Sequence, residues 1–308
     1  MGRAACTHPA PGLGRIPPLS RNTPFMNNTM ERSPRIDGHT LLAGVIGWPG
    51  AHSRSPLMHN FWLAQGRING AYVPLPVRPG AFDTAVKGLQ AAGFRGVNVT
   101  IPHKESAYRI VDRLDRSAQR SGSVNTLVFA ADGQIEGYST DGDGFVANVE
   151  AHGVAVRGGR ALLLGAGGAA RAIAASLLDR GVQVIVANRT RARAEALAAL
   201  LEGIEVTDWA RAGEALAGCT LLVNTTSIGM EGADNTAFPL DLAQADAGLV
   251  VCDIVYVPRQ TGLLQLAARH GLRTVDGLGM LIHQAGLGFE KWFGAQPAIV
   301  PEVEALLD

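Results

Sequence analysis

The stretch Gly165-Ala166-Gly167-Gly168-Ala169-Ala170 decides the fold, because it lies between an apolar run, 161–164, and a helix-like segment, 171–178. A glycine triplet alone usually marks a turn, whereas a G-x-G-x-x-[GA] pattern between strand and helix is typical of dinucleotide binding. The first glycine permits the tight turn, and the second lets the backbone approach a pyrophosphate at the helix N-terminus. The sequence therefore predicts a Rossmann-type, doubly wound nucleotide-binding domain.

The end of the next strand indicates which nucleotide is bound. Residues 182–187 are apolar and β-branched, as in a buried parallel strand. An NAD site usually places Asp or Glu at this point, but here Asn188-Arg189-Thr190 follows, and no carboxylate occurs before Glu195. Arg189 and Arg193 suit a 2′-phosphate, so the prediction is NADP. The alternative is a solvated basic start to a helix.

Composition describes an ordinary soluble chain. Its 308 residues suggest two domains, and 47% hydrophobic with 18% charged residues is typical of globular proteins. The formal net charge of zero gives no support for binding to nucleic acid or to an acidic membrane surface. No apolar run reaches the ~18 residues of a membrane span. Three separated cysteines (Cys6, Cys219 and Cys252) favour a reducing, cytoplasmic location.

Residues 1–37 differ from the rest, with six prolines and few acidic side chains. They contain no apolar segment of signal-peptide type. We expect a disordered extension, with an organellar transit peptide as the alternative, and Met26 or Met30 as alternative starts.

The remaining chain alternates predicted strands and helices, which indicates an α/β fold. The first part is expected to contain strands at 41–47, 71–75 and 96–100, helices at 55–64 and 81–92, and a hairpin of 124–129 with 134–138. The second unit starts near Asp141. It is expected to contain strands at 161–164, 182–187, 221–224 and 249–254 and helices at 171–178 and 263–270, followed by segments 278–293 and 301 onward.

Several motifs together resemble the shikimate dehydrogenase family over about residues 41–308. They are Gly47–Pro56, Asn98–Lys104, Val124–Thr126, Ser139–Gly142, Gly165–Ala170, Asn188–Thr190, Asn224–Met230, Asp253–Tyr256 and Met280–Ala285. The resemblance implies NADP-linked interconversion of 3-dehydroshikimate and shikimate, a step of aromatic amino acid biosynthesis. It also implies a substrate-binding domain split between 38–140 and 278–308, an NADP-binding domain at 141–277, and an active-site cleft between them.

Lys104 and Asp141 fit the chemistry of carbonyl reduction and match the family's catalytic lysine and aspartate. A lysine can donate the proton that a developing alkoxide needs, and a nearby carboxylate can orient its ammonium group. The alternatives are a solvated lysine after a strand and an aspartate in a turn.

Substrate-binding candidates carry hydroxyl and amide groups. Ser53 and Ser55 precede a helix and suit a carboxylate, or simply cap that helix. Neutral donors and acceptors suit the substrate's hydroxyls, and the resemblance implies substrate contacts for Asn98, Thr100, Lys104, Asn125, Asp141, Tyr256 and Gln284.

For the cofactor, the motif and the resemblance together imply contacts at Gly165, Ala166, Gly167, Gly168, Ala169, Asn188, Arg189, Thr190, Arg193, Thr226, Ile254, Gly277 and Met280. The spacing of His52, His59, His103 and His283 matches no usual zinc site, so no metal is expected.

Two departures from the family pattern concern substrate choice. Ser139 stands where the family usually has Asn, and Gly50 where it usually has Ile. A quinate/shikimate or aminoshikimate dehydrogenase is therefore an alternative.

A second alternative, of a different class, is a non-catalytic NADP-binding paralogue. The presence of both Lys104 and Asp141 argues against it. A folate-linked or amino-acid dehydrogenase would share only the nucleotide domain. The sequence leaves a homodimer open.

Overall fold

The computed structural model describes residues 36–49, 53–232 and 238–307. The predicted extension at 1–37 lies almost entirely outside the described residues. The alternative starts Met26 and Met30, together with Cys6, Gly50 and His52, lie outside them as well.

The first half of the chain forms a mixed six-stranded sheet with the order β2-β1-β3-β5-β6-β4. Strands β1, β2 and β3 pair in parallel, and β5 runs antiparallel to both β3 and β6. The elements are β1 (Leu41–Gly47), α1 (Ser55–Gln65), β2 (Gly70–Pro76), α2 (Phe82–Ala91), β3 (Gly96–Val99), α3 (Lys104–Ile110), β4 (Arg113–Leu114), α4 (Arg116–Ser121), β5 (Thr126–Phe129) and β6 (Ile135–Tyr138).

The second half forms an all-parallel six-stranded sheet with the order β12-β11-β10-β7-β8-β9. Read from the other edge, this is the doubly wound Rossmann order, and it confirms the predicted fold class. The elements are α5 (Asp141–Ala151), β7 (Arg160–Leu164), α6 (Gly168–Leu178), β8 (Gln183–Asn188), α7 (Arg191–Leu200), β9 (Ile204–Asp208), three 3₁₀ turns (Trp209–Arg211, Glu214–Leu216 and Leu242–Gln244), β10 (Leu221–Asn224), β11 (Val250–Asp253), α8 (Gly262–Arg269) and β12 (Arg273–Val275).

Both faces of the parallel sheet are buried. Along β7, Leu163 packs into the cluster that contains α5, α6 and α7, whereas Leu162 and Leu164 pack into the cluster that contains α8. Successive side chains of a strand point to opposite faces, so a continuous apolar run is what a doubly covered strand requires. This explains why the strands around the glycine turn could be predicted well.

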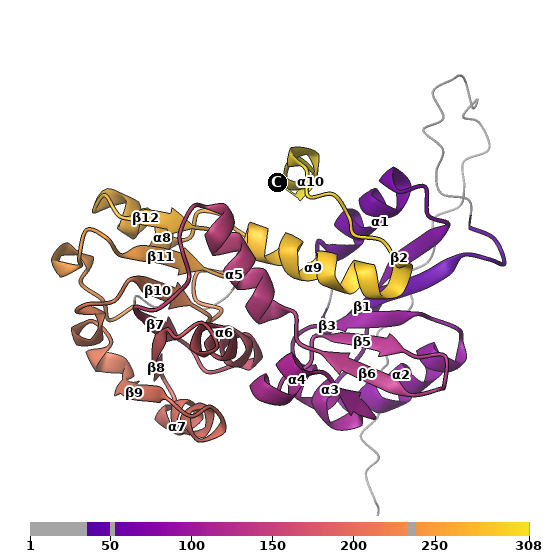
Figure 1. The fold of residues 1–308 in the computed structure, drawn as a ribbon, viewed down its shortest axis with the longest axis horizontal. Helices are drawn as coiled ribbons and strands as arrows, with labels where there is room; N and C mark the ends of the chain where they lie inside the picture. The colour runs from indigo at the N-terminus through magenta and orange to yellow at the C-terminus, as the bar shows by residue number, and fades with distance from the viewer. Residues whose placement is uncertain (1–35, 50–52, 233–237, 308) are drawn as a thin grey trace, which may run out of the picture. The chain divides into compact units, whose positions relative to one another are not determined.

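Two helices run between the sheets. Helix α5 packs against α6 of the second half and against α9 (Leu278–Phe293), and α5 and α9 lie side by side in Figure 1. Although α9 follows the second sheet in the chain, its Leu278, Ile282 and Phe289 pack in one cluster with residues of β1 and α1. The final helix α10 (Pro301–Leu307) adds to the same cluster. The C-terminal segment therefore returns to the first half, as the family resemblance implies.

A buried histidine stands among aromatic rings in this cluster. His59 is 0% exposed, stacks on Tyr72 with 3.9 Å between ring centroids, and neither ring nitrogen has a hydrogen-bond partner. Burial lowers the pKa of His59 to about 3. The ring is therefore neutral in the folded protein at pH values where it would be protonated in the unfolded chain.

We expect His59→Phe to maintain or raise stability, because it removes two unpartnered buried nitrogens while it keeps a flat ring. The unfolded chain binds a proton at His59 below pH 6.5 and the folded one does not, so the wild type loses stability as pH falls. That loss is about 1.4 kcal/mol per pH unit. Urea unfolding at pH 7.5 and 5.5 checks this. An unchanged pH dependence in His59→Phe would contradict it.

Candidate active site

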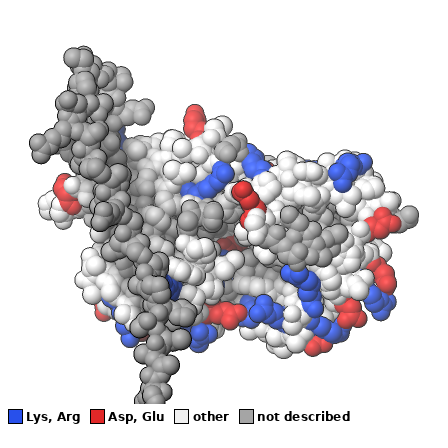
Figure 2. All heavy atoms as spheres, turned by 180° about the vertical axis from the view of Figure 1, so that it is seen from behind, with Lys and Arg blue, Asp and Glu red and all other residues white. Residues whose placement is uncertain are grey.

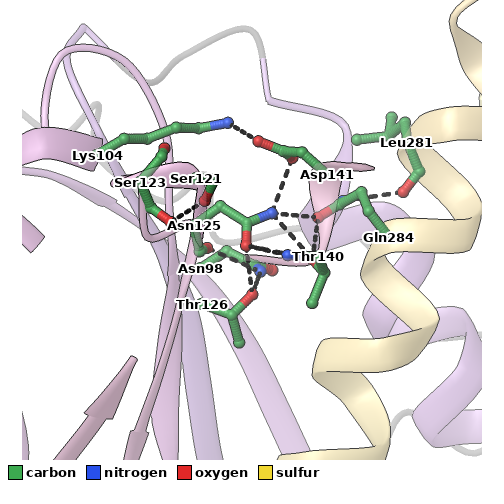
Figure 3. A network of polar contacts seen from close by, with 10 residues as sticks. All are labelled: Asn98, Lys104, Ser121, Ser123, Asn125, Thr126, Thr140, Asp141, Leu281 and Gln284. Carbon is green, nitrogen blue, oxygen red and sulfur yellow. Dashed lines mark hydrogen bonds and ion pairs between the residues drawn. The ribbon is translucent and has the colours of Figure 1, made fainter. Parts of the chain in front are cut away.

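Lys104 and Asp141 form an ion pair, which the Asn125 amide joins to the polar network in Figure 3. Lys104 is the first residue of α3 and Asp141 the first of α5. Asp141 is thus not a turn residue but begins the helix that runs between the sheets. Their side chains are 17% and 8% exposed, so the pair is shielded from water yet reachable.

The Asn125 amide holds the Asp141 carboxylate in place and links it to a wider polar network. Asn125, just before β5, donates from Nδ2 to Asp141 Oδ1 at 2.8 Å and to Thr140 Oγ1 at 2.9 Å. Its Oδ1 accepts from the Thr140 backbone N–H at 2.9 Å. Gln284, on α9, places Oε1 3.3 Å from Asn125 Nδ2 and donates to the Leu281 carbonyl at 2.9 Å. Residues far apart in the sequence therefore meet in one network around the Asn125 amide.

This arrangement can hold a proton at a fixed atom. The lysine ammonium carries three N–H donors, of which the carboxylate takes one. The others can approach an oxygen that gains negative charge, and the ion pair keeps the ammonium in one position.

The glycine turn lies against this pair. Gly165 has a φ of +113°, which favours glycine, and Gly167 caps α6. Nothing lies within 4 Å of the position a Cβ would take on Gly167, so an anion can approach the backbone there. A Cβ on Gly168 would come within 3.3 Å of Lys104 Cδ and 3.1 Å of Ser123 Oγ. The N-terminus of α6, with Ala169 in its first turn, thus faces the Lys104 side chain.

At the end of β8, the structure shows a carboxylate that the sequence analysis missed. Asp208 ends β9 and pairs in register with Asn188. Arg191 Nη1 is 2.5 Å from Asp208 Oδ1, and Arg191 Nε is 2.8 Å from Glu195. Strand pairing, not proximity in sequence, brings Asp208 to this edge, and Arg191 neutralises its charge. Arg189, Thr190 and Arg193 of the same segment are exposed.

Figure 2 shows basic and acidic side chains interspersed over one face of the molecule, as the net charge of zero suggests.

A second buried network supports the loops after β10 and β11. Asn224 Oδ1 accepts from Thr226 Oγ1 at 2.7 Å, and Asn224 Nδ2 donates to Asp253 Oδ1 at 2.9 Å. Asp253 also accepts from Thr261 Oγ1 at 2.7 Å. Burial raises the pKa of Asp253 to about 6. The sequence analysis quoted Asn224 and Asp253 only within motifs and gave them no role.

The predicted cofactor residues after these strands share one sheet edge. Ile254 directly follows β11, and its backbone carbonyl lies 2.5 Å from the position of a Cβ on Gly277. Gly277 caps α9, in which Met280 is 7% exposed. The ends of β7, β8, β10 and β11 meet at this edge, which is where dinucleotides bind in such folds.

The other predicted substrate residues fall into two groups. Asn98, on β3, is buried and joins the Asp141 network through Thr126. Ser53 and Ser55 stand at the start of α1, where Ser55 N–H donates to Ser53 Oγ at 3.4 Å. Thr100 follows β3 in a half-buried turn, and Tyr256 follows β11 with its pKa raised by burial. No described side-chain hydrogen bond joins Thr100 or Tyr256 to the network.

Ser139, the departure from the family pattern, has a buried hydroxyl with no hydrogen-bond partner. Ser117 Oγ instead contacts both the backbone N–H and the backbone carbonyl of Ser139, at 3.3 and 2.9 Å. Ser117 therefore supplies the side-chain hydrogen bonds to the backbone at this position.

His103 turns away from the ion pair. Its Nε2 is 2.8 Å from the Val77 carbonyl and its ring stacks on Phe82. Across residues 36–49, 53–232 and 238–307, no group of three His, Cys, Asp or Glu side chains could hold a metal ion. Among the helices in these ranges, none combines the length and apolar character of a membrane span.

A parallel sheet in Rossmann order, with a glycine turn set against a Lys–Asp pair, defines a dinucleotide-dependent oxidoreductase of two α/β units. Residues 45–127 match the shikimate dehydrogenase substrate binding domain, and residues 148–277 match the shikimate / quinate 5-dehydrogenase family. The chain belongs to the shikimate dehydrogenase family.

Individual relatives agree with this membership. The shikimate dehydrogenase (NADP(+)) of Gluconobacter oxydans is 59% identical over 85% of this chain and 93% of its own length. The shikimate 5-dehydrogenase of Thermus thermophilus, solved with NADP(H) and shikimate, is 38% identical with a TM-score of 0.78, covering 87% and 99% of the two chains. Quinate dehydrogenase of Corynebacterium glutamicum, solved with NAD, is 29% identical with a TM-score of 0.78, covering 87% and 99%.

Proposed function

We propose that this protein catalyses the reversible, NADP-dependent reduction of 3-dehydroshikimate to shikimate. The observation that carries the proposal is the Lys104–Asp141 pair, held against the first turn of α6 at Gly168. One site then brings together a nucleotide-binding turn and a proton donor, as reduction of a ring carbonyl requires.

In this proposal, NADPH supplies the hydride when bound. Lys104 gives a proton to the oxygen of the ring carbonyl as negative charge develops there. Asp141 holds the ammonium in position, and in the reverse direction Lys104 takes the proton back. Asn125 fixes the carboxylate through the 2.8 Å hydrogen bond to Oδ1, so that Oδ2 is left to Lys104.

The substrate would bind between these groups and the start of α1. Ser53 and Ser55 are assigned to the substrate carboxylate. Hydroxyl recognition is assigned to the amide and hydroxyl side chains of Asn98, Thr100, Asn125, Gln284 and Tyr256. Gln284 is supported by its place beside Asn125, and Asn98 by its burial next to the same network.

The second half, taken as residues 141–277, is assigned to NADP. The glycine turn would hold the pyrophosphate, and Arg189, Thr190 and Arg193 the 2′-phosphate. Thr226, Ile254, Gly277 and Met280 would flank the nicotinamide. The masking of Asp208 by Arg191 supports the choice of NADP, because an unpaired carboxylate there would repel a phosphate.

A spectrophotometric panel tests the proposal. Shikimate and quinate are each offered with NADP and with NAD, and absorbance at the nicotinamide band is followed. We expect the highest kcat/KM for shikimate with NADP. Faster turnover of quinate with NAD would replace this proposal with that of a quinate dehydrogenase, and no turnover of any pair would favour a non-catalytic paralogue.

The cofactor assignment predicts a selective effect of Arg189→Ala. Loss of a charge-assisted contact to the 2′-phosphate should weaken NADP binding by about 1.5–3 kcal/mol and change NAD binding little. Calorimetric Kd values for both nucleotides measure this. Arg211→Ala is the matched control, because Arg211 is an exposed arginine of the same half that pairs with Glu214. Equal weakening of NAD and NADP would contradict the assignment.

A further inference from the structure

Tyr72 lies in the core next to the candidate substrate site, and its hydroxyl group belongs to the hydrogen-bond network of that site. It is 1% exposed and belongs to β2, not to any motif singled out in the sequence. Tyr72 OH donates to Asn98 Oδ1 at 2.6 Å. Burial raises the pKa of Tyr72 well above its usual value, so the phenol stays protonated and can donate.

The sheet brings these two residues together. Ala43 of β1 pairs in register with Tyr72 on one side and with Gly96 on the other, and Val45 pairs with Asn98. Side chains two positions apart share a face, so Tyr72, Ala43 and Asn98 lie on the same face. The small Ala43 side chain leaves room for the Tyr72 ring to reach across β1. His59 stacks flat against that ring and fixes its plane, with 4° between the rings.

Each hydrogen bond between Tyr72 and Lys104 has a direction set by its neighbour. The Asp141 carboxylate only accepts, so Asn125 must turn its NH₂ group toward it. Asn125 Oδ1 then accepts from Thr126 Oγ1 at 3.2 Å.

The Thr126 hydroxyl has one proton, and it is used in that bond. Thr126 Oγ1 must therefore accept from Asn98 Nδ2, at 3.1 Å, which leaves Asn98 Oδ1 facing Tyr72. The chain Tyr72–Asn98–Thr126–Asn125–Asp141 thus runs in one sense, from phenol donor to carboxylate acceptor. Lys104 donates to the same carboxylate through its other oxygen. Figure 3 shows its part from Asn98 onward.

We propose that Tyr72 is a positioning residue for substrate binding: its hydroxyl locks the Asn98 amide in the one orientation that the Lys104–Asp141 site requires. The inference rests on the proposed function, since it takes Asn98 as a substrate contact.

Tyr72→Phe tests the inference, because it removes the hydroxyl and keeps the stacked ring. Asn98 Oδ1 is then buried without a donor, and the amide can rotate and compete for the Thr126 proton. We expect KM for shikimate to rise about tenfold, with kcat within about twofold of wild type, since Lys104 and Asp141 are untouched. The Kd for NADP should not change. Tyr138→Phe is the control, because that hydroxyl bonds to Glu136 on β6, away from this chain of hydrogen bonds.

A double-mutant cycle with Asn98→Ala shows whether Tyr72 acts through Asn98. We expect Tyr72→Phe/Asn98→Ala to match Asn98→Ala in KM within about twofold, because the partner is already gone. Thr126→Val breaks the next link with a side chain of the same shape and should raise KM in the same way. Thr126→Val also tests the inference on its own if circular dichroism shows that Tyr72→Phe does not fold.

Two results would overturn the inference: an unchanged KM in both Tyr72→Phe and Thr126→Val, or additive effects of Tyr72→Phe and Asn98→Ala. An inactive wild type is a different outcome, because it contradicts the proposed function itself. Turnover of shikimate by the wild type is therefore measured first.

Discussion

Lys104→Ala is expected to lower kcat for shikimate oxidation by about 10²–10⁴-fold, the range usual for a lost acid–base group. The ammonium is the charged donor that the Asp141 carboxylate holds, and its side chain is 17% exposed, within reach of a substrate oxygen. Alanine removes the donor and leaves Asp141 without its counter-ion. Steady-state kinetics across pH, with calorimetric NADP binding, measure the effect.

The control for this change is Lys87→Ala, since Lys87 is an exposed lysine of α2 and should leave kcat unchanged. NADP affinity should be nearly constant in both variants. A Lys104→Ala enzyme with normal kcat and only a raised KM would show that Lys104 binds substrate and that the proton comes from another group.

Asp141→Asn should lower kcat by about 10²-fold while the protein keeps its fold. The amide has the size of the carboxylate but no charge, so Lys104 loses the group that orients it. The new NH₂ group must also face either Asn125 Nδ2 or Lys104, both of which are donors. Kinetics on Asp141→Asn, with the melting temperature as a check on folding, measure this.

The double variant shows whether Lys104 and Asp141 act as one unit or independently of each other. If Lys104 and Asp141 act together, Lys104→Ala/Asp141→Asn should cost less than the product of the two single losses. A fully multiplicative loss would mean that Asp141 serves some purpose other than holding Lys104.

The nucleotide-binding half could be predicted closely from sequence because its strands are buried on both faces. Continuous apolar runs such as 161–164 are easily recognised, and the observed strand Arg160–Leu164 differs by one residue. Segment 104–121 was harder: α3, β4 and α4 have seven, two and six residues, too short for a clear period. Strand β9, with three of its five residues polar, was missed for a similar reason, and Asp208 with it.

In the candidate site, too, some residues could be predicted from the sequence and others could not. Lys104 and Asp141 could be singled out because their motifs are specific, and the structure brings them into contact. Tyr72 carries no motif. Its part in the site depends on register across three strands, which a single sequence does not reveal. The role of Tyr72 depends on which atoms donate and which accept along the chain of hydrogen bonds. That assignment requires the positions of all the partners in the structure.

The return of α9 to the first half also bears on how the chain is made. A ribosome releases the first sheet long before Leu278, yet the cluster of Met58, Trp62 and Tyr72 is completed by Ile282 and Phe289. Until that helix emerges, the apolar face of the sheet that it covers is exposed to water and to other chains. The strands of the second sheet come from one contiguous stretch, Arg160–Val275, and this sheet needs no such wait. Gln284 arrives with the same helix, so a segment synthesised after the second sheet completes both the core and the site.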